Sequence, residues 1–406
     1  MPTGGSSVRA VARSVKVLRV IPTLDPEMGG PQTTIVNAAI AERRALLELT
    51  IVFTGDKRSV TSTAPARARL DAADVRTLMF PRARWLPSSM VSRWGISRQM
   101  SVWLLRNAHR YDVVHVDYVW AWSTLVAAIA GSRAGRPVVM TAHESLTRFG
   151  IETRSGSVNP RAKLWMRAKL YMRGFLMHYI DLVVMTSDME RTDSIRPNER
   201  AVVIPHAVVA DPPEKPLAEP SFPPLIVGYI GRLHPKKNLE VLLHAVAALE
   251  TSTKVIVCGD GEPTYRAQLH RLANELSLTA QVEWRGHVDA TGRADLFAQS
   301  HVVAMPSAYE CFGMAAAEAM AAGVPVIVSK TTGVAPVVEE YKCGKLVEAG
   351  DVDQLRAALA DIAEDSGWRC RARVNALRAA AATYSYTSYG ERMAAIYAEL
   401  LADLRY

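Results

Sequence analysis

The chain reads PSAYECFGMAAAEAMAAGVP from residue 306 to residue 325, between two short apolar runs that are typical of buried strands. Alanine, the best helix former, dominates residues 314–322, which predicts a short helix that packs closely against a sheet. Gly323 suits a left-handed helix C-terminus, and Pro325 prevents the helix from continuing. The turn at 309–313 leaves free backbone N–H groups at the helix N-terminus, where anions are favoured.

Two carboxylates stand eight residues apart in this segment, Glu310 in the turn and Glu318 in the helix. Eight helical steps of about 100° bring the second within about 80° of the first, so both can border one crevice. Each can also be an ordinary solvated glutamate. The helix is apolar apart from Glu318, which indicates burial and a carboxylate that needs a partner.

These residues resemble a known signature. Glu310, Phe312, Gly313 and Glu318, with the Ala-Gly-Val-Pro-Val-Ile that follows, are similar to the E-x7-E motif of the retaining glycosyltransferases of family 4. The resemblance implies an α/β fold of GT-B architecture, in which two Rossmann-like, doubly wound domains face a cleft and a C-terminal helix crosses back to the N-terminal domain. It covers nearly the whole chain and is strongest in residues 227–355.

Length and composition agree with a two-domain globular protein. The chain has 406 residues, of which 49% are hydrophobic and 22% charged. No apolar stretch approaches the roughly 20 residues that span a bilayer, and no secretion signal is expected. The four cysteines lack metal-type spacing and indicate reduced thiols. We therefore expect a cytoplasmic protein, either free or peripheral on the inner face of the cell membrane.

Charge is divided unevenly along the chain. The net charge is +8, but residues 1–210 contain 29 Lys and Arg against 16 Asp and Glu, and the remainder contains 19 against 24. A basic first half indicates contact with something anionic. Nucleic acid, an acidic lipid surface and a phosphorylated acceptor all fit this charge.

Apolar runs alternate with helical patterns in both halves, which predicts parallel, doubly wound sheets. The expected strands are 15–21, 48–54, 75–80, 112–116, 137–141, 182–186, 201–205, 225–230, 254–258, 281–285, 301–305 and 324–329. Prolines crowd residues 211–224, as in an interdomain linker. We expect an acceptor-binding domain at 1–210, a nucleotide-sugar-binding domain at 211–386 and the returning helix at 387–406.

Two positions in the first half are candidate ligand contacts. Gly29 and Gly30 precede the expected helix 32–47, with Pro31 at its first position, so the backbone there can approach a phosphate; a plain turn fits equally well. His143 follows a predicted strand, at the strand end where ligands bind in such sheets. The resemblance implies that Gly30 contacts donor or acceptor and that His143 lies beside the transferred sugar.

Basic and aromatic residues alternate in Pro81–Arg110 and in Arg161–Tyr179. The second stretch has the pattern of a helix with one cationic and one apolar face, which can lie on an anionic membrane. A long surface helix whose Lys and Arg stems cover the core has the same pattern.

In the second half, Arg232 and Lys237 lie between a strand and a helix for which Asn238 is the expected N-cap. A guanidinium and an ammonium together suit a diphosphate. The pattern Gly-Arg-Leu-x-x-x-Lys is similar to the family's donor loop and implies that these two residues hold the donor diphosphate. The motif Gly259-Asp260-Gly261 lacks the full GxGxxG pattern, which argues against a dehydrogenase.

The resemblance also implies the remaining roles. Glu310 would bond the sugar hydroxyls and Glu318 the ribose hydroxyls, while the backbone N–H groups of Phe312, Gly313 and Met314 face the donor. No cofactor and no metal are expected, since Asp351-Val352-Asp353 reads as a helix cap. The family usually has Gly where this chain has Cys311, and Asn-Gly where it has His206-Ala207.

The expected reaction is retaining transfer of a sugar from a nucleotide-diphosphate sugar to a sugar, a lipid-linked or a small-molecule acceptor, such as an intermediate of surface-polysaccharide assembly. One alternative is a nucleotide-sugar epimerase of similar fold, which converts the donor without an acceptor. Another is a basic nucleic-acid-binding module, against which the acidic second half argues. No nucleic acid partner is therefore expected.

Overall fold

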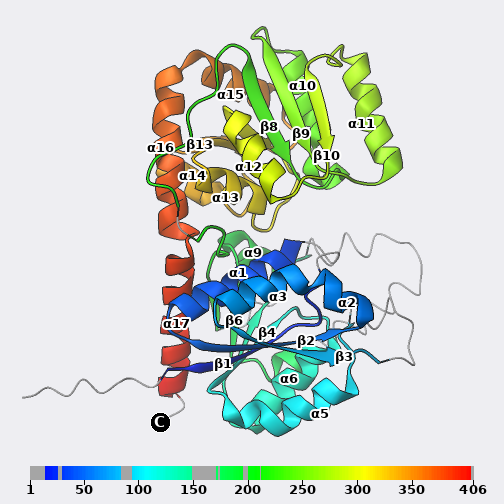
Figure 1. Cartoon of the computed structure of the whole chain (residues 1–406). Coiled ribbons are helices and arrows are strands. Elements are labelled where there is room, and N and C mark those ends of the chain that lie inside the picture. The colour runs from blue at the N-terminus through cyan, green and yellow to red at the C-terminus, as the bar shows by residue number, and fades with distance from the viewer. Residues whose placement is uncertain are drawn as a thin grey trace, which may run out of the picture. The chain divides into compact units, whose positions relative to one another are not determined.

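The computed structural model describes residues 14–25, 30–83, 94–148, 171, 174–194, 200–210 and 212–403 (Figure 1). The chain divides into two compact units. The first unit comprises Met1–Met140, Met172–Asp181 and Met393–Tyr406, and the second comprises Thr141–Tyr171 and Leu182–Arg392. The predicted membrane-facing helix at 161–179 falls largely outside the described residues.

The first half of the chain builds a seven-stranded sheet with the order β3-β2-β1-β4-β5-β6-β7. Its strands are β1 (Lys16–Val20), β2 (Glu48–Gly55), β3 (Arg76–Pro81), β4 (Val113–Asp117), β5 (Val138–Thr141), β6 (Leu182–Met185) and β7 (Ala201–Val203). The accompanying helices are α1 (Gly30–Arg44), α2 (Lys57–Ser62), α3 (Ala64–Ala72), α5 (Arg98–Asn107), η2 (Ala108–Arg110), α6 (Trp122–Arg133) and α9 (Asp188–Asp193). β1 pairs in parallel with both β2 and β4.

The second half builds a six-stranded parallel sheet with the order β10-β9-β8-β11-β12-β13. Its strands are β8 (Leu225–Ile230), β9 (Thr253–Cys258), β10 (Val282–Gly286), β11 (Val302–Met305), β12 (Val326–Ser329) and β13 (Gly344–Val347). Its helices are η3 (Pro235–Lys237), α10 (Leu239–Ala247), α11 (Pro263–Glu275), α12 (Ala290–Gln299), α13 (Met314–Ala321), α14 (Ala335–Tyr341), α15 (Val352–Glu364) and α16 (Ser366–Thr383). A last helix, α17 (Tyr386–Asp403), follows α16.

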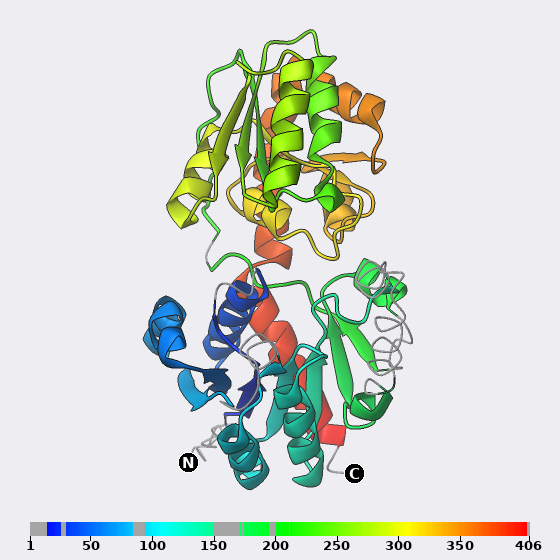
Figure 2. The same ribbon diagram turned by 90° about the vertical axis from the view of Figure 1, so that its right-hand side faces the viewer.

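Helices cover both faces of this second sheet (Figures 1 and 2). Strand β9 shows why its sequence is apolar without interruption. Val255 and Val257 point into a core formed with α10, α11 and α15. Ile256 and Cys258 point into the opposite core, formed with α12, α13, α14 and α16. Successive residues of a strand face opposite sides, so burial of both faces requires a continuous apolar run.

The two parallel sheets confirm the expected α/β fold with two Rossmann-like domains. Chain order reverses between β1 and β4 in one sheet and between β8 and β11 in the other. At such reversals the loops at the carboxyl ends of the strands diverge and leave room for ligands. The loops that follow β8 and β11 carry most of the predicted site residues.

Two helix starts differ in detail from the predictions. Asn238 is the N-cap residue of α10, as predicted, but it has the left-handed conformation with φ 51° and its side chain makes no cap hydrogen bond. It also ends the tight turn η3, which demands the left-handed geometry that Asn tolerates. Helix α1 begins at Gly30, so Pro31 is its second residue.

Candidate active site

Three cations project from the loop after β8, namely Arg232, Lys236 and Lys237. Lys237 Nζ donates a hydrogen bond to the Glu310 carboxylate, and the two side chains are 16% and 19% exposed. Arg232 is exposed and makes no ion pair with any residue that the structure describes. The structure thus brings together two of the predicted site residues and leaves the guanidinium of Arg232 open to an anion.

The same loop is strongly electropositive. Partial desolvation, and then the charges of Arg232, Lys236 and Lys237, lower the pKa of the His234 imidazole. The His234 ring accordingly accepts a hydrogen bond from the backbone N–H of Lys236 at 3.1 Å. A dianionic diphosphate is the kind of ligand that such a loop favours.

The Glu310 turn is fixed by backbone contacts to the loop after β12. Glu310 N donates to Thr331 O at 3.0 Å, and Gly333 N donates to Glu310 O at 2.8 Å. A Cβ on Gly333 would lie 2.2 Å from Cys311 O, so only glycine allows this approach. The carboxylate therefore stands on a rigid turn.

Gly313 completes the turn and precedes α13. Its φ is 104°, and a Cβ there would lie 2.9 Å from a methyl group of Thr332. The buried Phe312 precedes this glycine, and Met314, the first residue of α13, follows it. A backbone conformation that favours glycine therefore lies between the two residues. Cys311 is buried and does not have a positive φ, so the replacement of the family's usual Gly introduces no backbone strain.

His143 follows β5 in the left-handed conformation, with φ 48°. Its ring stacks on the ring of His206, with centroids 5.5 Å apart and planes inclined by 17°. His206 in turn meets the edge of Phe312, at 4.9 Å. The structure therefore connects the predicted sugar-facing histidine to the Glu310 turn through His206, which the sequence analysis did not assign to the site.

The buried carboxylate of Glu190 supports the loop that carries His143. Glu190 is fully buried and accepts hydrogen bonds from Glu144 N at 2.7 Å, Thr186 N at 2.6 Å and Thr186 Oγ1 at 2.8 Å. Glu144, whose φ is 63°, places its own carboxylate 2.7 Å from Lys236 Nζ. These contacts were missed in the sequence. The signal for them is the Ser-x-x-Glu spacing of a capping box that begins at Ser187, whose hydroxyl accepts from Glu190 N.

We expect Glu190→Gln to lower the free energy of unfolding by about 2 kcal/mol, because an amide turns one N–H donor towards the donors that the carboxylate now satisfies. Displacement of the His143 loop should also lower kcat/KM about tenfold. Urea unfolding and steady-state kinetics measure the two effects. Glu275→Gln, at an exposed position of α11, is the matched control, and equal behaviour of the two variants would contradict the supporting role.

Glu318 lies on α13, apart from the Lys237–Glu310 pair. Its side chain is 22% exposed, and its partner is Arg293 of α12, whose Nη1 lies 3.7 Å away. Burial raises the pKa of the Glu318 carboxyl, and the Arg293 charge offsets this only in part. Arg293 is thus the partner that a carboxylate on an apolar helix requires, and no sequence pattern pointed to it.

The last predicted contact, Gly30, belongs to the first unit and begins α1. That unit has polar groups of its own where its strands end. Arg82, directly after β3, donates to Asp25 at 2.5 Å and to Asp56 at 3.2 Å. Against the effect of burial, hydrogen bonds from Ser62 and then from Arg82, Thr23 and Ser59 lower the pKa of Asp25. Arg82 is therefore a paired residue and not a free surface cation of the basic stretch.

The described part of the chain contains no cluster of three or more His, Cys, Asp or Glu arranged to hold a metal ion. Asp351 is the N-cap of α15 and accepts from Gln354 N at 2.9 Å, which confirms its interpretation as a helix cap.

Comparisons with known proteins show what the chain is similar to. Residues 217–381 match the family described as Glycosyl transferases group 1, and residues 29–207 match the Glycosyl transferase 4-like domain. D-inositol 3-phosphate glycosyltransferase 2 of Catenulispora acidiphila is 28% identical over 320 residues, which are 73% of this chain and 72% of that protein. The D-inositol 3-phosphate glycosyltransferase of Mycolicibacterium paratuberculosis is 33% identical over 181 residues, 44% of this chain and 41% of that protein.

Solved structures resemble the fold. Anabaena Alr3699/HepE in complex with UDP has a TM-score of 0.70 and 20% identity, covering 95% of this chain and 100% of that one. Its complex with UDP-glucose has a TM-score of 0.69 and 21% identity, covering 95% and 99%. Sucrose-phosphate synthase from Thermosynechococcus elongatus has a TM-score of 0.68 and 20% identity, covering 96% and 100%.

Proposed function

The chain belongs to the glycosyltransferases of group 1, and from this premise we propose that it is a retaining enzyme that moves a sugar from a nucleotide-diphosphate sugar to a phosphorylated or lipid-linked acceptor. One observation carries the proposal. Lys237 is hydrogen-bonded to Glu310 beside the exposed Arg232, on the loops that follow β8 and β11. This arrangement offers a diphosphate two cations and a sugar one carboxylate within a single unit.

Departure of the nucleotide places negative charge on its outer phosphate. In the proposed reaction Arg232, Lys237 and the backbone N–H groups at Gly313 and Met314 stabilise that charge. The protein's own cations would then stabilise the leaving diphosphate, as a metal ion does in metal-dependent enzymes. Activity unchanged by EDTA is the expected result, and restoration of a lost activity by Mg²⁺ or Mn²⁺ would contradict this part of the proposal.

Retention of the anomeric configuration is consistent with the environments of Glu310 and His143. Glu310 is hydrogen-bonded to Lys237, which weakens a carboxylate as a nucleophile, and His143 is stacked on His206. We propose that the acceptor enters on the side of the departing nucleotide, with Glu310 on the sugar hydroxyls and His143 near the anomeric carbon. NMR of the product's anomeric proton tests retention directly.

The acceptor is proposed to be anionic. The relatives named above are glycosyltransferases for inositol 3-phosphate, and residues 1–210 of this chain carry an excess of 13 positive charges. An anionic acceptor would meet a favourable field there. No described helix is long and apolar enough to cross a membrane. We propose a cytoplasmic site of action with reversible membrane contact, which stronger binding to anionic than to neutral vesicles would support.

A thermal-shift panel of UDP, GDP, ADP and their sugars tests the donor class first. A ligand at about 100 times its dissociation constant stabilises by roughly 2.7 kcal/mol, which a melting curve resolves. The best donor is then incubated with and without inositol phosphates and lipid-linked sugars. A glycosylated product confirms the transferase, whereas conversion of the donor alone would identify an epimerase.

Donor affinity should fall in acid because of Glu318. The pKa of this carboxyl is raised, so it protonates at a higher pH than an ordinary Glu and then loses an acceptor site for a ribose hydroxyl. We expect donor affinity to drop up to about tenfold as the pH is lowered through the range in which this carboxyl protonates, measured by calorimetry with a nucleotide sugar.

Glu318→Gln is the control for this pH effect, because its amide does not titrate and its affinity should stay low and flat. Protonation of His234 acts with the opposite sign, since a cation there attracts the diphosphate. A wild-type affinity that rises in acid would therefore remove Glu318 from the ribose and point to His234 instead.

A further inference from the structure

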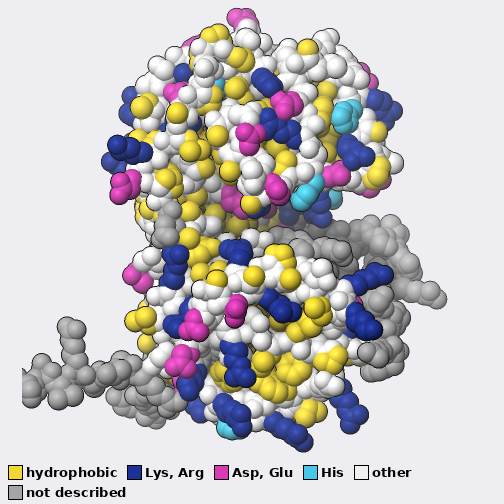
Figure 3. Space-filling view, in the orientation of Figure 1, with side chains coloured by type: hydrophobic (Ala, Val, Ile, Leu, Met, Phe, Trp, Pro, Cys, Tyr) yellow, Lys and Arg dark blue, Asp and Glu magenta, His cyan; other side chains and the backbone are white. Residues whose placement is uncertain are grey.

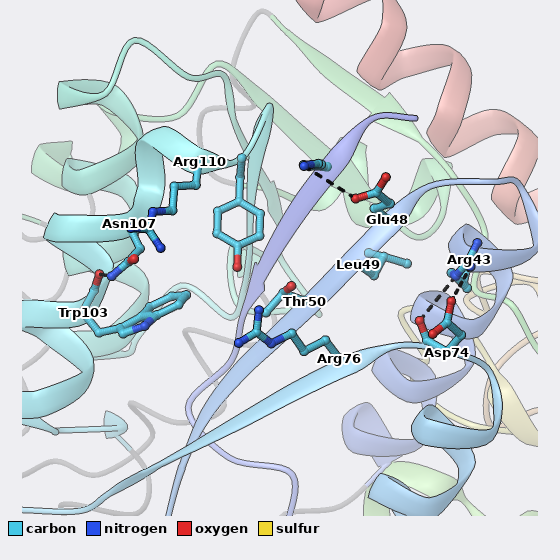
Figure 4. A pocket seen from close by; sticks show the side chains of 11 residues that line it. Arg43, Glu48, Leu49, Thr50, Asp74, Arg76, Trp103, Asn107 and Arg110 are labelled. Carbon is cyan, nitrogen blue, oxygen red and sulfur yellow. Dashed lines mark hydrogen bonds and ion pairs between the residues drawn. The ribbon is translucent and has the colours of Figure 1, made fainter. Parts of the chain in front are cut away.

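A cavity of about 590 Å³ lies in the first unit, between β1, β2, β3 and the segment α5–η2 (Figure 4). The side chains that matter for its chemistry are Thr50, Arg76, Trp103, Asn107, Arg110 and Tyr111. Arg76 lies beside Thr50 on the sheet, while Trp103, Asn107 and Arg110 face them from α5 and η2 (Figure 4).

This cavity lies at the amino edge of the first sheet, whereas the Lys237–Glu310 pair belongs to the second unit. Lys16 and Glu48, the first residues of β1 and β2, are register partners, and Arg76, the first residue of β3, pairs with Thr50. Parallel strands that begin together end together, so these residues mark the amino edge of the sheet. Asp25 and Arg82 follow the carboxyl ends of the same strands. The cavity lining therefore contains none of the residues of the candidate active site.

The charges that line the cavity do not cancel. Lys16 Nζ lies 3.9 Å from Glu48, and Arg43 lies 2.5 Å from Asp74, so both carboxylates have cations of their own. Arg76 and Arg110 are exposed, and neither makes an ion pair or side-chain hydrogen bond with a residue that the structure describes. Two uncompensated guanidinium groups thus remain, a charge that matches a phosphate dianion.

The walls also offer a packed aromatic surface and neutral donors. Trp103 is held between Phe80 and Tyr111, with ring centroids 5.7 Å and 6.4 Å away. Tyr111 is 9% exposed and Thr50 is largely buried, yet within the described part of the chain neither hydroxyl has a hydrogen-bond partner. Both O–H groups can therefore donate to a ligand.

Basic side chains are frequent on this unit as a whole. The space-filling view shows more Lys and Arg than Asp and Glu on its visible face, with apolar side chains between them (Figure 3). The cavity differs from this general background because its guanidinium groups converge with hydroxyls and an indole.

We propose that this cavity binds the phosphate group of a phosphorylated ligand, with Arg76 and Arg110 as the anion-holding residues and Trp103 against the body of the ligand. Arginine forks match phosphate oxygens two at a time, which a hydrated lysine does not. The same chemistry is presented by a soluble phosphate ester and by the headgroup of an anionic phospholipid. The site is independent of the proposed glycosyl transfer.

The test uses the whole protein, saturated with UDP so that the donor site is filled, and titrates inorganic phosphate by calorimetry at low ionic strength. The double variant Arg76→Gln/Arg110→Gln should weaken binding at the cavity at least about tenfold. Arg58→Gln/Arg106→Gln removes the same charge from exposed positions of α2 and α5 outside the cavity and should leave binding unchanged.

A second arm separates the two sources of phosphate. Vesicles of phosphatidylcholine with phosphatidylglycerol are compared with vesicles of phosphatidylcholine alone by co-sedimentation. Loss of the anionic-vesicle preference only in the cavity variant assigns the site to a lipid headgroup, and an unchanged preference with lost phosphate binding assigns it to a soluble ester. Equal phosphate binding by the cavity and control variants would overturn the proposal.

Discussion

Replacing Lys237 by alanine should lower kcat/KM about a hundredfold, which corresponds to about 3 kcal/mol of lost transition-state stabilisation. The side chain is only 16% exposed and hydrogen-bonds Glu310, so its ammonium is already held where it must act. Its removal takes a cation from the leaving diphosphate and at the same time releases Glu310, which is proposed to bind the sugar. Arg232→Ala should cause a loss of similar size through the diphosphate alone.

The two variants separate these roles. Arg232 has no partner among the residues described, so Arg232→Ala should weaken binding of UDP and UDP-sugar equally. Lys237→Ala should weaken binding of the UDP-sugar more than binding of UDP, since it also releases Glu310 from its hydrogen bond. Lys254→Ala, which removes a half-buried lysine paired with Glu283 on the same sheet, is the control and should be almost neutral. Folded Lys237→Ala protein with near-normal turnover would falsify the assignment of the diphosphate site.

The parts of the site that were predictable lie on continuous segments of chain. Residues 231–238 and 309–318 each run from a strand into a helix, and a strand-to-helix turn constrains its own residues to one edge of a sheet. The pairing of Lys237 with Glu310 then follows from β8 and β11 being neighbours. The strands were predictable for a similar reason, because burial on both faces demands long apolar runs.

The contacts that could not be predicted join residues far apart in the chain. Glu190 holds the backbone of Glu144 from 46 positions away, and His206 lies against His143. Single-sequence periodicity carries no information on such pairs. Asn238 takes the predicted N-cap position without the cap hydrogen bond for a different reason, since the preceding tight turn fixes its left-handed conformation.

Arg19 shows the same limit most clearly. The segment 15–21 alternates apolar and basic residues, which is also the pattern of a strand with one solvated face. In the structure Arg19 is 1% exposed and its guanidinium holds two buried carboxylates, Asp117 at 3.0 and 3.1 Å and Glu42 at 2.7 Å. The network continues to α17 through His115, whose Nδ1 lies 2.6 Å from the Tyr397 hydroxyl. It thereby ties the last helix to the core of the first unit.

Arg19→Ala should therefore lower the free energy of unfolding by about 3–5 kcal/mol, because it leaves two carboxylates buried without their cation. Chemical denaturation followed by circular dichroism measures the loss. Arg43→Ala removes an arginine from the partly exposed pair with Asp74 in the same unit and should cost under about 1 kcal/mol. A loss for Arg19→Ala no larger than that of Arg43→Ala would show that the buried charges are compensated in another way.

The pH dependence of the free energy of unfolding tests the same network in a second way. Burial raises the pKa of Glu42 to about 7, although Arg19 acts to lower it. Between an ordinary Glu pKa near 4.5 and this value, the folded protein binds the proton that the unfolded chain has released. This group should therefore make the protein less stable as the pH rises through that window. Without Arg19 the pKa of Glu42 rises further, so the decline should extend to higher pH in Arg19→Ala. In the double variant Arg19→Ala/Glu42→Gln the decline of stability with rising pH that Glu42 causes should disappear. Part of the lost stability should also return, because no proton has to leave a buried carboxyl at position 42.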